Sequence, residues 1–302
     1  MEIDWREWNN VEEQKMKGLI LAAGKGTRLY PMTKPVCKPL LPVYDKPLIY
    51  YPLSIMIECG ITDIMVIIPD GEEETFDRLL GDGSAWGVNI SYRVQKVPRG
   101  IADAFLVAED FIAGESVCLV LGDNIFYDET REYQFMQEAQ QDNVSATVFG
   151  YYVEDPRAFG VVEFDADGNA ISIEEKPRFP KSNYIIPGLY FYDADVLEIA
   201  KNLKPSARGE LEITDVNLEY LRRGKLKVVP LSDSFVWLDA GTADNLLHAA
   251  NCVHEVQERT GRYIACPEEV AYYKGLISQE EVHQAGKQLG QTLYGQYLQC
   301  LL

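Results

Sequence analysis

The chain lacks the features by which membrane-spanning and exported proteins are recognised. Its 302 residues contain no run of about 18 apolar residues, so no transmembrane helix is expected. The first residues, MEIDWREWNNVEEQKMKG, are acidic and have no apolar centre, which differs from a signal peptide. We therefore expect a cytoplasmic protein with no membrane partner, whose residues 1–15 form an N-terminal tail.

Histidine is scarce and cysteine is scattered, which argues against a metal site built from these residues. The sequence has three histidines and six cysteines, and no two cysteines form a CxxC pair. Zinc sites need closely spaced ligands of this kind, so none is predicted. Without an export signal, the cysteines are expected to be free thiols in a reducing compartment.

Acidic residues are absent from one segment of an otherwise acidic chain. The net charge is −19, which argues against nucleic acid as a partner. Residues 14–44 nevertheless contain no Asp or Glu, whereas random placement of the chain's acids predicts about five. We expect an anionic ligand there. The basic residues of the segment are Lys15, Lys17, Lys25, Arg28, Lys34 and Lys38.

The order of apolar segments predicts an α/β fold. Continuous apolar runs, typical of strands buried on both faces, alternate with amphipathic segments, which indicates a mostly parallel sheet covered by helices. Close-spaced strands follow residue 143, with a hairpin turn at DADGN, and the chain is helical after residue 243. We expect a main domain over 16–242 and a helical region over 243–302. The expected strands are 17–23, 63–69, 116–123 and 225–231, and the expected helices are 48–59, 102–111, 196–203 and 214–223.

The segment after the first strand has the composition of a phosphate site. Gly24 and Gly26 allow backbone N–H groups to approach a phosphate, while Arg28 and Lys38 supply positive charge. The pattern GxxxxGK[ST] of the P-loop is absent, and Leu29 occupies the third glycine position of the dinucleotide motif GxGxxG, which disfavours a dehydrogenase. A tight turn with a solvated basic face is the alternative, which the missing acids make less attractive.

Two aspartates follow predicted strands. Asp123 ends VLGD and Asp239 ends WLD, and the carboxyl ends of parallel strands face the ligand crevice of such sheets. Two carboxylates there can hold Mg²⁺. Each could instead cap a helix.

Eight blocks, in order along nearly the whole chain, resemble the sugar-1-phosphate nucleotidyltransferase family, and within it the glucose-1-phosphate thymidylyltransferases. The resemblance implies the family's Rossmann-like three-layer fold, with residues 16–242 as the catalytic domain. The blocks are LAAGKGTRLYPMTKPVCKPLLP, DKPLIYYPLS, LLGDGSAWG, VLGDNIFY, EEKP, NLKPSARGELEITDVN, WLDAGT and YGQYL.

The resemblance also implies roles for individual residues. The expected catalytic residues are Arg28, Lys38 and Lys176, and the expected Mg²⁺ ligands are Asp123 and Asp239. The expected nucleotide-binding residues are Ala23, Gly24, Gly26, Thr27, Gln95, Gly100 and Asp123. The expected sugar-phosphate-binding residues are Asn124, Gly160, Glu175, Lys176, Tyr190 and Arg208.

The reaction implied is attack of glucose 1-phosphate on the α-phosphorus of dTTP, giving dTDP-glucose and pyrophosphate, in a homotetramer. The attacking phosphate is already anionic, so no general base is needed, which fits the scarcity of histidine. Pro39 and Pro187 differ from the residues usual at these positions, so UTP or another sugar 1-phosphate is an alternative. A non-catalytic nucleotide-sugar-binding protein is a second alternative, but such a protein is expected to lose Arg28 or a metal aspartate.

Overall fold

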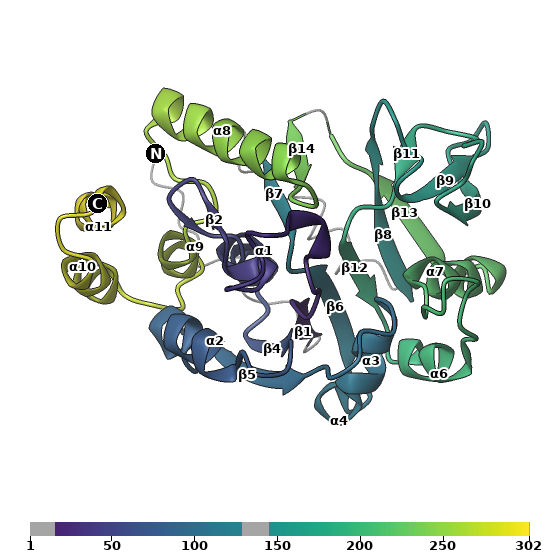
Figure 1. Ribbon diagram of the computed structural model, residues 1–302, viewed down its shortest axis with the longest axis horizontal. Coiled ribbons are helices and arrows are strands. Elements are labelled where there is room, and N and C mark those ends of the chain that lie inside the picture. Colours follow the sequence, from purple (N-terminus) through teal and green to yellow (C-terminus); the bar gives the residue numbers. More distant parts are fainter. Residues whose placement is uncertain (1–15, 129–144, 233, 302) are drawn as a thin grey trace.

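A computed structural model describes residues 16–128, 145–232 and 234–301, so the expected tail over 1–15 lies outside the described residues (Figure 1). Its centre is a ten-stranded mixed sheet in the order β10-β9-β11-β8-β12-β6-β1-β4-β5, with β13 pairing to β8. The mixed α/β architecture, with helices on both faces, confirms the predicted fold class. No helix of the described part is long and apolar enough to cross a membrane.

The first half of the sheet is parallel, as the apolar runs predicted. β1 lies between β4 and β6, and β5 pairs with β4 at the edge. The middle residues of β1, β4 and β6 are buried because helices cover both faces of the sheet. The four strands are β1 (Met16–Leu21), β4 (Asp63–Ile68), β5 (Asn89–Val94) and β6 (Ser116–Leu121).

Alternation along these strands divides the apolar core between the two faces of the sheet. Ile20 and Val120 belong to one cluster, and their neighbours Leu19 and Leu119 belong to another. Successive side chains of a strand point to opposite faces, so one strand contributes to both cores. The first cluster includes residues of α1 (Tyr50–Glu58) and α2 (Glu73–Leu80), and the second those of α3 (Asp103–Val107), α6 (Asp195–Asn202) and α7 (Ile213–Arg222).

The second half of the sheet is largely antiparallel. β12 pairs with β6 and β8, and β9, β10 and β11 continue the sheet beyond β8. The DADGN turn forms as predicted, because Asp165 N–H donates to the Asn169 carbonyl at 2.9 Å and Gly168 has a φ of 84°. The strands are β8 (Ala146–Tyr152), β9 (Gly160–Phe164), β10 (Ala170–Glu175), β11 (Tyr184–Ile185), β12 (Leu189–Tyr192) and β13 (Leu226–Pro230).

Short elements differ from the sequence-based expectations. The helix expected over 102–111 is two helices, α3 and α4 (Glu109–Ile112), separated at Ala108, where φ is −103° and ψ is 15°. β6 is followed by β7 (Asn124–Asp128), which leaves the main sheet and pairs with β14 (Phe235–Asp239). A small hairpin joins β2 (Pro42–Val43) to β3 (Lys46–Pro47).

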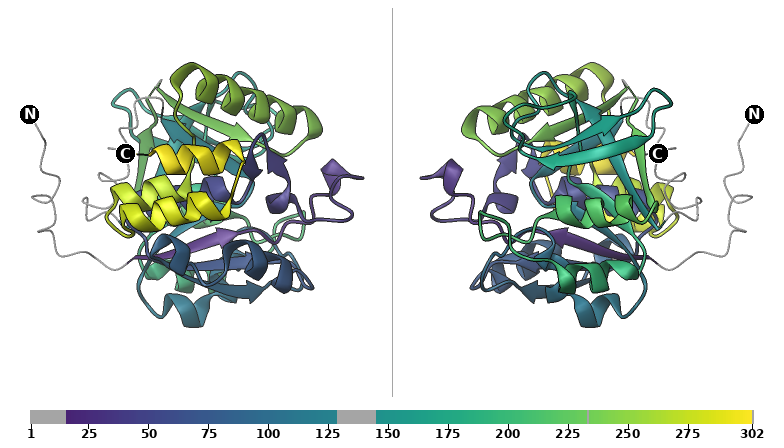
Figure 2. Two further views of the ribbon diagram at one scale, coloured as in Figure 1. Left: turned by 90° about the vertical axis from the view of Figure 1, so that its left-hand side faces the viewer. Right: turned by 90° about the vertical axis from the view of Figure 1, so that its right-hand side faces the viewer.

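The chain ends in helices, as predicted. Figures 1 and 2 show α10 and α11 side by side, at the opposite end of the molecule from β9 and β10. Cys266, Val282 and Leu298 from this region belong to the same core cluster as α1. The helices are α8 (Ala243–Thr260), α9 (Pro267–Tyr273), α10 (Gln279–Gln288) and α11 (Leu293–Cys300).

Candidate active site

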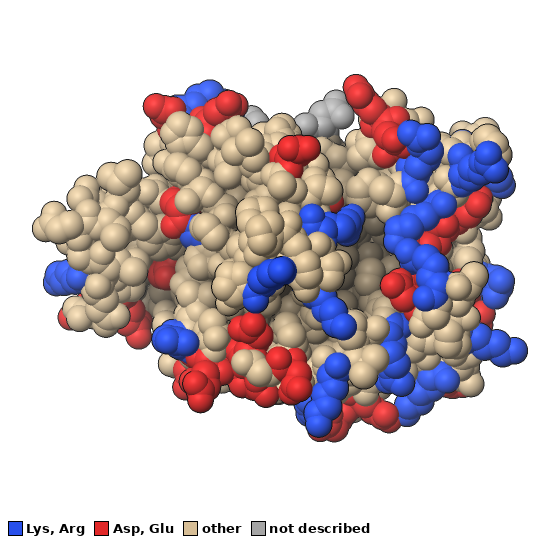
Figure 3. Space-filling view, viewed as in Figure 1, with Lys and Arg blue, Asp and Glu red and all other residues tan. Residues whose placement is uncertain are grey.

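The site expected from the sequence lies where the carboxyl ends of the central strands meet. β1 is the switch point of the sheet, since the chain continues to β4 on one side and to β6 on the other. Two backbone bonds hold these ends together, from Ala22 N–H to the Ile67 carbonyl at 2.8 Å and from Gly122 N–H to the Leu21 carbonyl at 2.9 Å. Figure 3 shows Lys and Arg side chains gathered on both sides of a hollow right of centre.

The loop after β1 is folded tightly around Gly26. Gly26 has a φ of 59°, and the Thr33 hydroxyl donates to its carbonyl oxygen at 2.7 Å. A Cβ atom at Gly26 would lie 3.0 Å from Thr33 Cγ2 and 3.1 Å from Lys38 Cβ. At Gly24 no atom lies within 4 Å of such a Cβ. Gly26 is therefore required by the loop itself, whereas Gly24 borders open space that a ligand can enter.

Asp123 and Asp239 are brought to the same place by the pairing of β7 with β14. Asp239 lies opposite Asn124 in register, and Ala240 N–H donates to the Asp123 carbonyl at 3.2 Å. Burial raises the pKa of Asp239, and the negative charge of Asp123 raises it further, while Lys38 and Arg28 act in the opposite direction. Asp239 is not the cap of α8, because Thr242 accepts from Asn245 N–H there.

Lys38 connects the basic loop to this carboxylate pair. Its side chain is 8% exposed, and its Nζ lies 2.5 Å from Asp123 Oδ2. Lys38 begins the 3-10 turn Lys38–Leu40, which buries Pro39. The lysine expected to bind phosphate and an aspartate expected to bind the metal are thus in direct contact.

Asn124 uses its whole side chain inside the protein. Its Nδ2 donates to Asp123 Oδ1 at 2.8 Å, and its Oδ1 accepts from Gly188 N–H at 3.2 Å and from Trp237 Nε1 at 2.6 Å. Asn124 is 4% exposed. Its geometry therefore suits holding the Asp123 carboxylate more than contacting a sugar directly.

A second charged group surrounds Glu175, the last residue of β10. Glu175 Oε1 is 3.1 Å from Lys176 Nζ and 3.3 Å from Arg208 Nη2, while Glu175 Oε2 accepts from the Thr214 hydroxyl at 2.5 Å. A Cβ atom at Gly160 would lie 3.0 Å from Thr214 Oγ1. The structure thus brings together four of the residues expected at the sugar phosphate.

Thr214 and Glu212 take part in this group without having been expected. The carboxylate of Glu212 forms the shortest ion pair of Arg208, at 2.7 Å, and its hydrogen bond raises the pKa of Arg208. Both residues are buried although they are polar. Their only signal in the sequence is polarity within the run GELEIT, which a surface turn would show equally.

Tyr190 lies between the two charged groups. Its ring is buried on β12, and burial raises the pKa of its hydroxyl, with further contributions from the charges of Glu175 and Asp123. Asp123 and Glu175 therefore act on the same side chain, as residues of one site would.

Gln95 and Gly100 lie in a loop that follows β5 at the same edge of the sheet. Gln95 N–H donates to the Ile68 carbonyl at 2.9 Å, at the end of β4. Gly100 has a φ of 108°, and a Cβ there would lie 2.4 Å from the Leu211 carbonyl oxygen. Two backbone bonds, Leu211 N–H to Arg99 O and Ala102 N–H to Leu211 O, join this loop to the segment carrying Arg208.

No contact among the described residues tests the nucleotide-binding roles expected for Ala23 and Thr27 or the catalytic role expected for Arg28. Ala23 is buried just beyond β1, and Thr27 and Arg28 are exposed in the 3-10 turn Thr27–Leu29. None of the described residues forms a hydrogen bond or an ion pair with the Arg28 guanidinium. That side chain is consequently available to a ligand.

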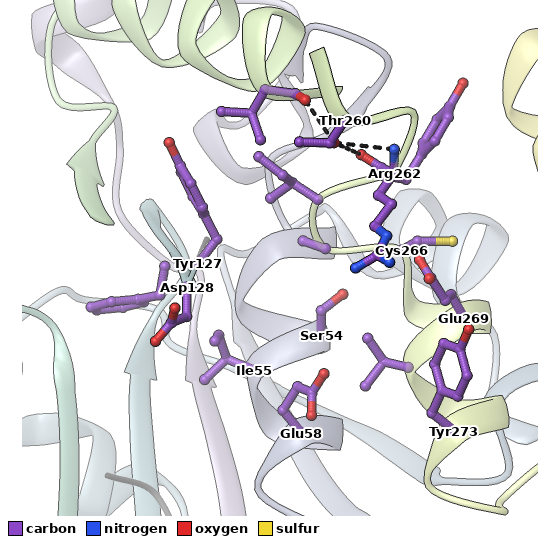
Figure 4. A pocket seen from close by; sticks show the side chains of 16 residues that line it. Ser54, Ile55, Glu58, Tyr127, Asp128, Thr260, Arg262, Cys266, Glu269 and Tyr273 are labelled. Carbon is purple, nitrogen blue, oxygen red and sulfur yellow. Dashed lines mark hydrogen bonds between the residues drawn. The ribbon is translucent and has the colours of Figure 1, made fainter. Parts of the chain in front are cut away.

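A cavity of about 290 Å³ lies elsewhere, between α1, the end of β7 and the segment joining α8 to α9 (Figure 4). None of the residues expected at the active site lines it. Its polar lining includes Ser54, Glu58, Asp128, Arg262 and Glu269.

The aspartate pair fits a divalent cation that is also bound by its substrate. Among the described residues, no three His, Cys, Asp or Glu side chains are placed to hold a metal ion together. The Asp123 and Asp239 carboxylates, however, lie close enough for the charge of Asp123 to raise the pKa of Asp239, and a cation relieves such repulsion. The remaining ligands would be phosphate oxygens and water, as is usual for Mg²⁺.

Comparison with known proteins places the chain in a family. The family model described as "Nucleotidyl transferase" matches residues 17–256. Curated glucose-1-phosphate thymidylyltransferases from Neisseria gonorrhoeae and Mycobacterium tuberculosis are 53% and 51% identical to this chain, each over 95% of it and 99% of the relative.

Solved structures agree with these relatives. A crystal structure from Bacillus anthracis, assigned to glucose-1-phosphate thymidylyltransferase and containing sucrose, is similar with a TM-score of 0.72 and 45% identity, over 78% of this chain and 94% of that chain. A UDP-glucose pyrophosphorylase, with a TM-score of 0.70 and 24% identity, shares the fold. The match to the family model and the identity to these relatives show that the chain belongs to the nucleotidyl transferase family.

Proposed function

We propose that this protein is a glucose-1-phosphate thymidylyltransferase, which joins glucose 1-phosphate to dTTP and releases pyrophosphate. The observation that carries the proposal is the arrangement of charge in one hollow. Asp123, which contacts Lys38, and Glu175, which contacts Lys176 and Arg208, both lie near the buried Tyr190 side chain, so two anionic substrates can be held close to each other. The curated relatives of about 50% identity, which bear this name, support the choice of substrates.

The protein's part in the reaction is to position and to neutralise charge. The phosphate of glucose 1-phosphate is the nucleophile, and an oxygen of that group attacks the α-phosphorus in line with the leaving pyrophosphate. Lys176 and Arg208 would orient the attacking phosphate of glucose 1-phosphate. Lys38 would face the α-phosphoryl group of the nucleotide. Arg28 would hold the leaving end of the triphosphate, where negative charge accumulates.

The proposed cofactor is Mg²⁺ held by Asp123 and Asp239. When bound, it would neutralise phosphate oxygens of the nucleotide. Asn124 keeps the Asp123 carboxylate oriented through its Nδ2. Lys38 would leave Asp123 and turn toward the nucleotide phosphates.

Pyrophosphate release, measured by an enzyme-coupled assay, tests both parts of the proposal. We expect dTTP with glucose 1-phosphate to be the best pair in a panel of nucleoside triphosphates and sugar 1-phosphates. EDTA should abolish activity, and excess Mg²⁺ should restore it. Absence of release with every pair would contradict the transferase, and full activity in EDTA would contradict the metal role.

A preference for UTP or another sugar 1-phosphate is the second candidate. Pro39 lies directly beside Lys38 and has neither a side-chain amide nor an N–H to offer a base. The same panel separates the two candidates, because UTP would then give the higher kcat/KM.

We also propose that the protein acts in the cytoplasm as a homotetramer. All six cysteines are free thiols, which fits a reducing compartment. Light scattering coupled to gel filtration tests the assembly, since a monomer would have a mass of 34.1 kDa.

A further inference from the structure

Asp103 is a buried carboxylate for which the proposed mechanism has no use. It is the first residue of α3 and only 1% exposed. Its Oδ2 accepts from Gln95 Nε2 at 2.8 Å, and its Oδ1 accepts from Arg99 Nη2 at 2.6 Å. Burying a carboxylate is costly unless it is paired, so this arrangement calls for an explanation.

The contact with Asp103 fixes which way the Gln95 amide is turned. An ionised carboxylate can only accept hydrogen bonds, and in a glutamine amide only the nitrogen can donate. The nitrogen must therefore face Asp103, and Oε1 must face away from it. Among the described residues, none donates a hydrogen bond to Gln95 Oε1, so this acceptor remains available although the residue is 6% exposed.

Arg99 reinforces this orientation. Its side chain is 58% exposed, and its guanidinium donates to the second oxygen of Asp103, which holds the carboxylate in place. The backbone of the same residue is bonded to Leu211. Gln95, Asp103 and Arg99 thus form one connected unit beside the loop that carries Gly100.

We propose that Asp103 is a positioning residue that makes Gln95 present a hydrogen-bond acceptor to the base, so that the site selects pyrimidines that carry an N3–H. This inference rests on the proposed function. Thymine and uracil have a donor at N3, which Gln95 Oε1 can accept, and a carbonyl oxygen beside it for the second Nε2 hydrogen. Cytosine has an acceptor at N3. Its N3 lone pair would face the lone pairs of Gln95 Oε1, and the two acceptors would repel each other.

The substitution Asp103→Asn tests the proposal, because an amide at this position can pair with either orientation of Gln95. We expect the ratio of kcat/KM for dTTP to that for dCTP to fall at least about tenfold, mainly through KM. Asp103→Leu, which removes every acceptor, should lower the ratio further. Asp110→Asn, at an exposed ion pair with Arg93 in the adjacent helix, is the matched control and should keep the wild-type ratio.

A double-mutant cycle separates positioning from a merely structural role. In a Gln95→Met background, Asp103→Asn should cause no further loss of selectivity, because Asp103 acts through Gln95. Additive losses would overturn the proposal, and so would an unchanged ratio in Asp103→Asn.

The wild-type protein provides a test that does not depend on the folding of a variant. A dTTP analogue methylated at N3 lacks the donor, and we expect its kcat/KM to be at least about 100-fold lower than that of dTTP. Equal use of the two would overturn the role of the Gln95 acceptor. A wild type that releases no pyrophosphate with any nucleotide would instead contradict the proposed function, so the two failures are distinguishable.

Discussion

Removing the Arg28 side chain should lower the catalytic rate without changing the stability of the fold. It is exposed and none of the described residues pairs with it, so Arg28→Ala should leave the unfolding temperature unchanged. Losing one preorganised charge at the leaving group typically costs a factor of about 10²–10³ in kcat. Arg223→Ala is the control, because it removes an exposed arginine at the far end of α7, where it pairs with Glu219 at 2.9 Å. Wild-type kcat in Arg28→Ala would contradict its proposed role.

Asn124 offers the opposite case, a polar residue whose loss should affect both stability and metal use. Asn124→Leu leaves Gly188 N–H and Trp237 Nε1 without their acceptor in the interior, and each such loss costs about 1–3 kcal/mol. We expect the free energy of unfolding in urea to fall by roughly 2–6 kcal/mol. The concentration of Mg²⁺ needed for half-maximal activity should rise, because Asp123 loses its orienting bond.

Asn89→Leu is the matched control for this substitution. Asn89 is exposed, and within the described residues its side chain bonds only to Asp63, at 3.1 Å, so both quantities should stay near their wild-type values. An Asn124→Leu variant with unchanged metal dependence would show that Asn124 does not position Asp123.

At the scale of elements, the loop after β5 and the segment around Leu211 depend on one close approach of their backbones. Gly100→Ala would place a methyl group 2.4 Å from the Leu211 carbonyl, at a φ of 108°. We expect a loss of about 3 kcal/mol or more in unfolding free energy, with weaker binding of dTTP by calorimetry. Gly114→Ala shares a positive φ of 84° but has open space around it, so it should cost only about 1–2 kcal/mol and leave dTTP binding unchanged. Equal effects of the two substitutions would argue against the close approach.

The elements that could be predicted from the sequence are those whose environment is uniform. The runs that became β1, β4 and β6 are apolar except near their first residues, because both of their faces are covered. β7 was not expected, since NIFYD follows an apolar strand directly and its partner, β14, lies more than a hundred residues later. The break at Ala108 is likewise absent from the sequence pattern, because no glycine or proline marks it.

The same distinction applies to the candidate site. Residue types at strand ends and the missing acids pointed to Asp123, Asp239 and the basic loop, which the structure brings together. Thr214, which bonds to Glu175, and Asp103, which bonds to Gln95, could not be predicted as site partners, because each contact joins residues on different elements. The individual catalytic and binding roles stay predictions until the variants are measured.

For the whole molecule, the C-terminal helices share the core of the α/β body. Leu298 in α11 is fully buried in the cluster that contains α1, whereas Leu293 in the same helix is 70% exposed. Leu298→Ala should lower the unfolding free energy by about 3 kcal/mol, and Leu293→Ala should change it by less than about 0.5 kcal/mol. A shared core also predicts one cooperative transition in urea for both variants. A separate early transition in Leu298→Ala would show that the helices form an independent unit.

The backbone bonds between Arg99, Leu211 and Ala102 have a consequence for protein engineering. Backbone hydrogen bonds join the loop proposed to bind the base to the segment proposed to hold the sugar phosphate. Replacing only one of the two segments with that of a relative that prefers other substrates would leave these backbone hydrogen bonds without matching partners. Chimeras that exchange both segments together should therefore keep activity where single-loop grafts lose it. In such chimeras the preferences for the nucleotide and for the sugar 1-phosphate should change together.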